Sequence, residues 1–371
     1  MKEKIISPAG IFVFAVLALA ACGSPQRIEN ITVMSWNVQA LFDGNDNGNE
    51  YAEYRHSAGW NNEKYRNRLN TLGSALAESL PDVLVLIEVE SPSILDDFSK
   101  LPGMKGYHAS FFGRNNGLGI GVLSRFPLGA ARLHSVNLYG IETPRPVAEV
   151  WIEAASPLVL LACHWKSKLG GDEETETARR ASALAVNRVL DEIAAAAPEA
   201  AVIVLGDLNE NHDEFERNGG AYICALMNKA DAEGIDPSAP ILLSSPGRKK
   251  QRLLLPKPGL GPDYRDYLVL SADPGSMAVD SNSPKNTLYS PWFNEGGQNG
   301  SYYYREEWET IDHMLFNDRC FDGSGWDFES FSVITAAPFT GADGIPFAYN
   351  PRTGNGLSDH LPLAARLVLA P

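Results

Sequence analysis

The run Ala201-Val-Ile-Val-Leu-Gly-Asp-Leu-Asn209 is the most informative stretch of the chain. Its first five residues are apolar, and a short apolar run of this kind is typical of a strand that is buried on both faces. Asp207 and Asn209 follow at the end of the run, where a polar side chain can leave the core and face a cleft. The stretch therefore predicts a buried strand with a functional group at its edge.

Other predicted strands end in the same way, with a polar side chain at or directly after an apolar run. A carboxylate that closes a buried strand lowers stability unless it is paired or binds a cation, so the repetition predicts one shared rim. The residues at these strand edges are Asn37, Glu88, His164, Asp207, Asn209, Asp312, His313, Asp359 and His360. Strand alternation points His313 away from the face of Asp312, and we expect His313 to be structural.

The side chains at these strand edges are of types that suit a single kind of chemistry. The four carboxylates offer hard oxygen ligands, which suit Mg²⁺, Mn²⁺ or Ca²⁺, and His164 and His360 offer acid–base groups near neutral pH. The sequence has no Cys/His cluster at zinc spacing, no Gly-x-Ser-x-Gly turn and no phosphate-cradling Gly-x-x-x-x-Gly-Lys loop. This inventory predicts metal-assisted attack of water on phosphorus.

The order of predicted elements indicates the class of sheet. Apolar residues recur at helical spacing in 61–80, and 174–197 also has a helical pattern. Strand patterns are more numerous and several follow one another directly, which favours mixed or antiparallel sheets with helices outside over a doubly wound parallel sheet. The predicted strands are 31–37, 82–88, 119–124, 131–138, 147–154, 158–164, 201–206, 266–270, 310–316, 331–335 and 361–369.

Five short motifs occur in the order and rough spacing of those in the endonuclease/exonuclease/phosphatase superfamily, which the chain resembles from about residue 31 to 369. They are Trp36-Asn37, Ile87-Glu88, Gly206-Asp207-Leu208-Asn209, Ile311-Asp312-His313 and Ser358-Asp359-His360. One motif alone would be a weak signal, but the ordered set is specific. The resemblance implies an α/β (α+β) fold, a four-layer sandwich of two packed mixed β-sheets flanked by helices, with the site at one sheet edge.

The resemblance also implies roles for the residues on the metal and water side of the site. Glu88 would be the main metal ligand, with Asn37 beside it and Asp359 supporting the same side. Asp207 would orient or deprotonate the attacking water, and Asn209 would hold a phosphate oxygen. Mg²⁺ is the expected cofactor, with Mn²⁺ and Ca²⁺ as alternatives.

On the leaving-group side, the resemblance implies that Asp312 orients the His360 imidazole. His360 would then steady the pentavalent phosphorus or protonate the leaving oxygen. These two residues and the water side together would complete the hydrolytic site.

Two further segments are similar to the deoxyribonuclease-like and extracellular-nuclease branches. They are Pro144-Arg145-Pro146 and His164-Trp-Lys-Ser-Lys168. In those branches an Arg and a second His flank the scissile phosphate, which implies a catalytic role for His164. Arg145 can grip phosphate as a fork and Lys166 as a point charge, although either can also be a solvated surface charge.

The N-terminus predicts export. Lys2 and Lys4 precede the uncharged apolar run 11–20, which has the length of a signal-peptide core and is too short to cross a bilayer. Leu19-Ala20-Ala21-Cys22-Gly23 resembles a bacterial lipobox, so we expect a signal peptide over 1–21, a lipid on Cys22 and a tether over 22–30. The protein would then be anchored to a bacterial membrane, in the periplasm or at the surface. The alternative is an ordinary secretory signal cut near Ala21.

The rest of the chain, 31–371, is predicted to be a single domain, because motifs spread from residue 37 to 360 must converge. A surface insertion rich in Pro, Gly and Ser is expected near 236–262. It carries the densest basic cluster, Arg248, Lys249, Lys250 and Arg252, which is either a solvated loop or a phosphate contact. Cys163 is expected to be a buried thiol, and a bridge between Cys224 and Cys320 is possible.

Taken together, these patterns predict a phosphodiesterase acting on nucleic acid, with DNA favoured over RNA and a non-specific endonuclease as the leading form. The net charge of -15 disfavours tight electrostatic binding of a polyanion and predicts transient contact. Alternatives are an enzyme of the same fold acting on phospholipid headgroups or inositol phosphates, and a catalytically inactive binding lipoprotein.

The chain is expected to be a monomer without a protein partner. The segment 301–308 is a candidate for packing or for stacking a base or sugar.

Overall fold

A computed structural model describes residues 29–113, 117–138, 141–143, 145–233, 241–243, 253–255, 265–277, 286–294 and 299–371. The expected signal peptide, Cys22 and nearly all of the expected tether lie outside these residues, as does most of the predicted insertion near 236–262, including its basic cluster. Within that insertion the structure describes one short antiparallel pair, β12 (Ile241–Leu243) and β13 (Leu253–Leu255). No helix within the described ranges is long and apolar enough to span a membrane.

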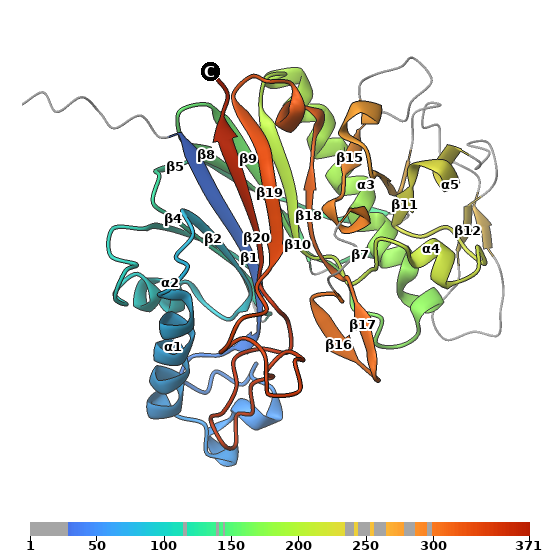
Figure 1. Cartoon of the computed structure of the whole chain (residues 1–371). Coiled ribbons are helices and arrows are strands. Elements are labelled where there is room, and N and C mark those ends of the chain that lie inside the picture. Colours follow the sequence, from blue (N-terminus) through green and yellow to red (C-terminus); the bar gives the residue numbers. More distant parts are fainter. Residues whose placement is uncertain are drawn as a thin grey trace, which may run out of the picture.

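Two large mixed β-sheets form the body of the protein (Figure 1). In the first, the order is β19 (Trp326–Val333), β20 (Leu363–Leu369), β1 (Asn30–Leu41), β2 (Val83–Val89), β4 (Gly119–Ser124) and β3 (His108–Phe112). In the second, the order is β11 (Leu226–Asn228), β14 (Leu268–Ser271), β15 (Thr287–Tyr289), β18 (Asp312–Phe316), β10 (Ala201–Asp207), β9 (Pro157–His164), β8 (Val147–Glu153) and β5 (Leu128–His134). The observed mixture of parallel and antiparallel pairs confirms the predicted sheet class.

Strand β10 shows why its sequence is apolar without interruption. Ile203 and Leu205 join the core cluster that also contains residues of the first sheet. Val202 and Val204 face the other way and pack with the long helix α3 (Asp172–Ala196). Because both faces of β10 are covered, both sets of alternating side chains must be apolar.

Helices complete the four layers. The helix α1 (Asn62–Leu76) begins after Asn61, whose side chain accepts hydrogen bonds from the first-turn amides of Glu63 and Lys64. It packs its apolar face into the same core as the first sheet, together with α2 (Pro92–Phe98). On the second sheet α3 covers the outer face. The four-layer α/β sandwich predicted from the sequence is therefore confirmed.

The cysteines of the described residues are all buried free thiols. Cys163 is a buried thiol on β9, as predicted. Cys224 and Cys320 are not bonded to each other, so the bridge considered from the sequence is not formed.

A wide bulge interrupts the pairing of β1 with β2. Asn37 pairs with Ile87 and the next registered pair is Leu41 with Val89, so residues 38–40 lie opposite Glu88 alone. Gln39 and Ala40 both have φ of 54° and Glu88 has φ of 70°. A bulge bends a strand and re-aims its side chains, so this one sets the direction in which Glu88 leaves the sheet.

We predict that Gly206→Ala lowers the stability of the protein strongly. Gly206 has φ of 125° and lies opposite Cys163 in the parallel pair β9–β10, where an added Cβ would collide with the Cys163 carbonyl oxygen. Strain and collision together should lower the free energy of unfolding by about 1–3 kcal/mol or more. Urea denaturation checks this. Gly48→Ala is the control, because Gly48 also has positive φ but open space around it; equal losses in both variants would contradict the prediction.

Candidate active site

The sheet register gathers the predicted residues of the second sheet into one row. Asp207 at the end of β10 lies between His164 of β9 and Asp312 of β18. All three side chains are at least nine-tenths buried. The row follows from the sequence pattern, since each residue ends or begins a buried strand at the same edge.

Asn37 joins this row from the first sheet. Its Nδ2 donates to Asp207 Oδ2 at 3.0 Å, and its Oδ1 accepts from the Gln39 amide at 3.0 Å. Asp207 also accepts from the Asn209 amide through Oδ1 at 2.9 Å. Burial raises the pKa of Asp207 to about 7, with nearby His360 lowering it and Asp312 raising it. A carboxyl group of this pKa can take up or release a proton near neutral pH.

Glu88 lies on the other side of this row, at the bulge of the first sheet. Its Oε2 accepts from the Ala40 amide at 2.7 Å. Its Oε1 lies 3.6 Å from His164 Nε2, which is also 3.6 Å from Asp207 Oδ2. These separations are too long for hydrogen bonds but leave the three groups facing one another. Desolvation raises the pKa of Glu88, because the surrounding protein disfavours its charged form.

His164 is held in its neutral form. Burial lowers its pKa well below the ordinary value, and the positive charges of Arg145 and His360 add to that effect. A neutral imidazole can donate or accept one hydrogen bond near the reacting groups, but it does not supply a positive charge.

His360 and Asp312 form a buried, hydrogen-bonded pair. His360 Nδ1 lies 2.7 Å from Asp312 Oδ2, which also accepts from the Ser301 hydroxyl at 2.6 Å. Burial by itself would lower the pKa of His360, but the carboxylates of Asp312, Asp359 and Asp207 together outweigh burial, and the pKa is raised well above its ordinary value. The imidazole is therefore protonated at neutral pH, with Nε2 able to donate a proton. Asp359 Oδ1 lies 3.9 Å from this Nε2.

The two predicted phosphate-binding cations differ in their surroundings. Arg145 donates through Nη1 to the Trp165 carbonyl, next to Asn209, whose Nδ2 donates to the same oxygen at 3.2 Å. Lys166 instead folds back on its own loop, where Nζ donates to the carbonyls of Ser167 at 2.9 Å and Leu169 at 3.1 Å. Arg145 thus lies beside Asn209, and phosphate binding by Arg145 and by Lys166 stays a prediction.

The donor set fits a divalent cation. Ligand atoms of Asp207, Asp312 and His360 lie within 4.8 Å of one another. Asp312 and His360 already engage each other, however, so we favour the Glu88 side, where the carboxyl groups of Glu88 and Asp207 both have raised pKa values. A bound divalent cation would stabilise both in their charged forms. The predicted metal residues Asn37, Glu88 and Asp359 remain the candidates for holding it.

Several supporting residues were not predicted from the sequence. Ser301 orients Asp312, the Trp36 indole donates to the His360 carbonyl at 2.9 Å, and Gln39 accepts from the Asp359 amide at 3.1 Å. Trp36 belongs to a motif that was recognised, whereas Ser301 and Gln39 carry no pattern of their own. Their roles depend on contacts between distant parts of the chain.

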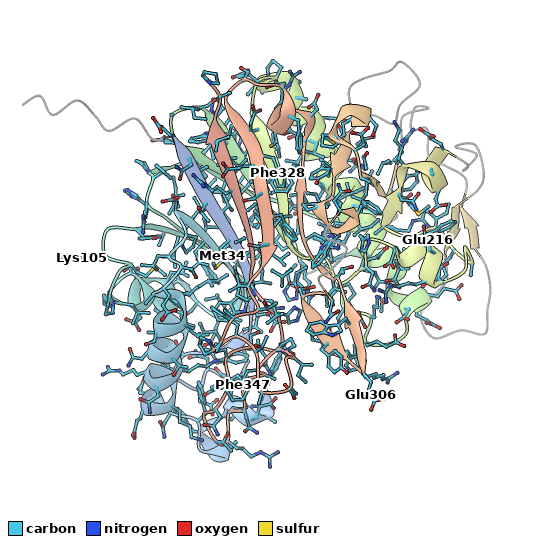
Figure 2. All side chains as sticks on the ribbon, in the orientation of Figure 1. Met34, Lys105, Glu216, Glu306, Phe328 and Phe347 are labelled. Atoms are coloured by element: carbon cyan, nitrogen blue, oxygen red, sulfur yellow. The ribbon has the colours of Figure 1, made fainter. Side chains whose placement is uncertain are left out.

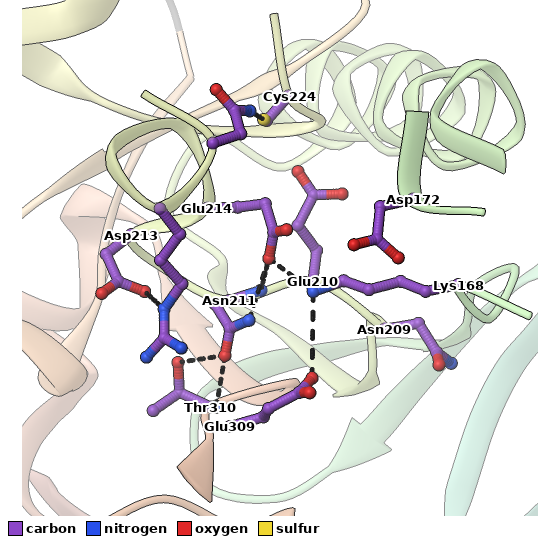
Figure 3. Close-up of polar contacts among 12 residues, drawn as sticks. Lys168, Asp172, Asn209, Glu210, Asn211, Asp213, Glu214, Cys224, Glu309 and Thr310 are labelled. Atoms are coloured by element: carbon purple, nitrogen blue, oxygen red, sulfur yellow. Dashed lines mark hydrogen bonds and ion pairs between the residues drawn. The ribbon is translucent and has the colours of Figure 1, made fainter. Parts of the chain in front are cut away.

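A second polar network supports the loops around Asn209 (Figure 3). Lys168 Nζ bonds Glu214 at 2.6 Å, and Glu214 accepts from the Asn211 side chain at 2.9 Å. Asn211 Oδ1 in turn accepts from the Thr310 amide at 2.7 Å, close to β18. This network joins the loop that carries Asn209 to the residues directly before Asp312 of β18, and so fixes the position of one relative to the other.

His313 is buried on the opposite face, as predicted, with Nε2 2.8 Å from the Glu210 carbonyl.

The aromatic segment before β18 forms the hairpin of β16 (Tyr302–Tyr304) and β17 (Glu307–Glu309), and Figure 2 shows Glu306 at its tip, away from the body. The Tyr302 ring lies 4.6 Å from the His360 ring, and Tyr304 stacks on Tyr302 at 6.1 Å. The hairpin therefore borders the site directly.

These features define a protein of the phosphoester-hydrolase class. A model of the Endonuclease/Exonuclease/phosphatase family matches residues 34–360, and the chain belongs to that family. No curated protein sequence matches it significantly.

Solved structures share the fold at low sequence identity. ANGEL2, a 2′,3′-cyclic phosphatase, has 14% identity and a TM-score of 0.53, covering 92% of this chain and 96% of its own. An endonuclease/exonuclease/phosphatase family protein from Bacteroides thetaiotaomicron has 13% identity and a TM-score of 0.51, covering 92% and 95%. D. rerio TDP2, solved with a single-strand DNA product, has 14% identity and a TM-score of 0.50, covering 91% and 98%.

We predict that Asp312→Asn lowers the pKa of His360. The substitution keeps the size of the side chain but removes its negative charge, and an opposite charge this close shifts a pKa by about 1–3 pH units. An NMR titration of the imidazole in metal-free protein measures the change. Ser301→Ala is the matched control, since it removes a hydrogen bond to Asp312 and leaves its charge. A His360 pKa that stays the same in Asp312→Asn would show that the charge of Asp312 does not keep the His360 imidazole protonated.

Proposed function

We propose that this protein is a divalent-metal-dependent phosphodiesterase that hydrolyses nucleic acid, DNA in preference to RNA, as a non-specific endonuclease. The observation that carries the proposal is the convergence of a proton acceptor and a proton donor at one sheet edge. Asp207 is a buried carboxyl group that accepts from Asn37, and His360, which is bonded to the Asp312 carboxylate and has a raised pKa, lies beside it. Glu88 and Asn37 border the same edge from the first sheet.

In the proposed reaction, Asp207 accepts the proton of the attacking water, and the amide of Asn37 holds the carboxylate in its orientation. The Nε2–H of His360 donates a proton to the leaving oxygen, while Asp312 stabilises the imidazolium and, after the transfer, keeps the remaining proton on Nδ1. Arg145 and Asn209 donate to the same carbonyl, that of Trp165, and would hold the nonbridging phosphate oxygens.

Glu88, Asn37 and Asp359 would hold the cation, Mg²⁺ by preference and Mn²⁺ or Ca²⁺ as alternatives. When bound, a divalent cation supplies charge stabilisation at phosphorus and lowers the pKa of a bound water. The chain's own contribution is to orient the Glu88 carboxylate. Glu88 has one of its two carboxylate oxygens bonded to Ala40 and the other directed at the site.

A polynucleotide substrate is supported by the aromatic hairpin and by one structural neighbour. Tyr304 is 47% exposed and stacks on the outer side of Tyr302, whose ring is tilted against that of His360, and the Arg305 guanidinium lies 5.1 Å from the Tyr304 ring centre. Aromatic and guanidinium faces of this kind stack bases without reading sequence. The structure of D. rerio TDP2 holds a single-strand DNA product in a related fold. The net charge of -15 agrees with transient binding.

Phospholipid headgroups or inositol phosphates are the alternative substrates for the same site. ANGEL2, described as a 2′,3′-cyclic phosphatase, indicates that the fold also serves a different phosphoester. A catalytically inactive binding lipoprotein is less well supported, because every catalytic position expected from the family motifs is filled.

We predict that the protein nicks supercoiled plasmid in Mg²⁺, Mn²⁺ or Ca²⁺, and that EDTA stops the reaction. His360→Ala should reduce the rate by about 10²–10⁴-fold, because it removes the general acid. Agarose electrophoresis over time measures both. His108→Ala, which changes an exposed histidine of β3, is the matched control and should cut like the wild type. Plasmid left intact by every metal would refute the DNA assignment, and RNA, sphingomyelin and inositol phosphates would be tested next.

We also propose that the protein is exported and lipid-anchored through Cys22, on the strength of the charged start, the short apolar run and the lipobox-like Leu19–Gly23. Expressed in a bacterium with labelled palmitate, the wild type should carry label and sediment with membranes. Cys22→Ala should lose both properties. If the two proteins instead leave the cytoplasm equally and neither carries label, the leader is an ordinary secretory signal.

A further inference from the structure

A buried arginine lies beneath the bulge of β1. Arg68 of α1 is 2% exposed, and its guanidinium donates to three consecutive carbonyls of that bulge. Nη2 bonds the Val38 carbonyl at 2.5 Å and the Gln39 carbonyl at 2.6 Å, while Nη1 bonds the Ala40 carbonyl at 3.0 Å and the Tyr54 hydroxyl at 3.1 Å. One side chain thus donates to every carbonyl of the segment that lies opposite Glu88, and the Ala40 carbonyl also accepts from the Phe42 amide at 3.1 Å.

The surroundings of Arg68 are unusual for a buried cation. Among the described residues, the Arg68 guanidinium forms no ion pair with a carboxylate, although buried charges are normally paired. The guanidinium instead lies 3.9 Å from the ring centre of Tyr349 and 5.8 Å from that of Tyr54. A hydrophobic residue would fill this volume without the desolvation cost, so packing alone does not explain an arginine here.

The bulge held by Arg68 reaches the candidate metal residues by two routes. The first is the Ala40 amide, which donates to Glu88 Oε2 at 2.7 Å. The second is the Gln39 side chain, whose Oε1 accepts from the Asp359 amide at 3.1 Å. Both Gln39 and Ala40 have φ of 54°, a conformation that residues with a Cβ rarely adopt without added support.

We infer that Arg68 is a positioning residue of the metal site: by bonding the carbonyls of residues 38–40 it holds the Ala40 amide against Glu88 and the Gln39 side chain against Asp359. The inference rests on the proposed function, because it takes Glu88 as the main metal ligand. A site of this kind tolerates little displacement of its ligands, and groups that orient ligands typically change metal affinity by about 10- to 100-fold.

The test measures metal binding rather than activity, in the purified protein with Mn²⁺ as the probe. Arg68→Met keeps the length and apolar stem of the side chain and removes every donor. We expect its Mn²⁺ affinity, measured by titration calorimetry and by the EPR signal of free Mn²⁺, to fall by about 10- to 100-fold. Arg68→Lys keeps the charge without the fork and should fall between Met and wild type.

Arg66→Met is the matched control, since Arg66 is an exposed residue of the same helix, and it should bind Mn²⁺ as the wild type does. Glu88→Gln serves as the reference for a lost ligand. If Arg68→Met and Arg68→Lys are folded and bind Mn²⁺ with wild-type affinity while Glu88→Gln does not, Arg68 is only a packing residue and the inference is overturned. If Arg68→Met fails to fold, the affinity of Arg68→Lys decides in the same way.

The failure of the proposed function gives a different result. A wild-type protein that binds no Mn²⁺, or a Glu88→Gln variant that binds it normally, overturns the metal site itself, and the role of Arg68 with it. If the wild type binds Mn²⁺ and only Glu88→Gln weakens that binding, the metal site is supported and only the role of Arg68 is overturned.

Discussion

The carboxylate of Asp207 lies where the two sheets meet, and it accepts hydrogen bonds from both sides of that junction. Asn37 donates from the first sheet, and the Asn209 amide donates from the loop that follows β10. Burying a carboxylate lowers stability unless its oxygens accept hydrogen bonds. These bonds therefore fix the position of the two sheets relative to each other at this point. The relative position of the two sheets in turn determines where the other residues of the site lie.

The junction also divides the site electrostatically. On one side, His360 is kept protonated by Asp312, which is itself oriented by Ser301. On the other side, Glu88 and Asp207 share a region in which desolvation raises both pKa values. Groups whose surroundings push their pKa values apart are the usual basis for acid and base roles in one site. The same surroundings leave the acidic side short of positive charge, which a divalent cation would provide.

The ends of the buried strands could be predicted from the sequence because that prediction needs only local information. An apolar run marks β10 and β9, and the polar residue that ends each run marks the edge, so the sequence could anticipate that Asp207 and His164 lie together. Glu88 was found in the same way, although the bulge that aims it was not. A bulge depends on the register between β1 and β2, and the register is a property of two segments that are far apart in the chain.

The residues that orient the side chains of the site show the limit of such reasoning more clearly. Ser301 acts through a contact with Asp312, and Arg68 through three carbonyls that carry no side-chain signal at all. In the sequence, Arg68 stands in a helix with Arg66 two residues before it, and the two look alike. The helix turns one into the core and the other into solvent, as the helical period requires, since residues two apart lie on different faces.

What distinguishes Arg68 physically is that its partners are backbone atoms of a segment held partly in the left-handed conformation. Without the guanidinium, the carbonyls of residues 38–40 would be buried without these donors, and the segment would gain by relaxing toward a regular strand. Relaxation would carry the Ala40 amide away from Glu88. The bulge, the Arg68 guanidinium and the direction of the Glu88 carboxylate are therefore one structural unit. In this unit the arginine offsets the stability lost to local strain, and Glu88 keeps one orientation.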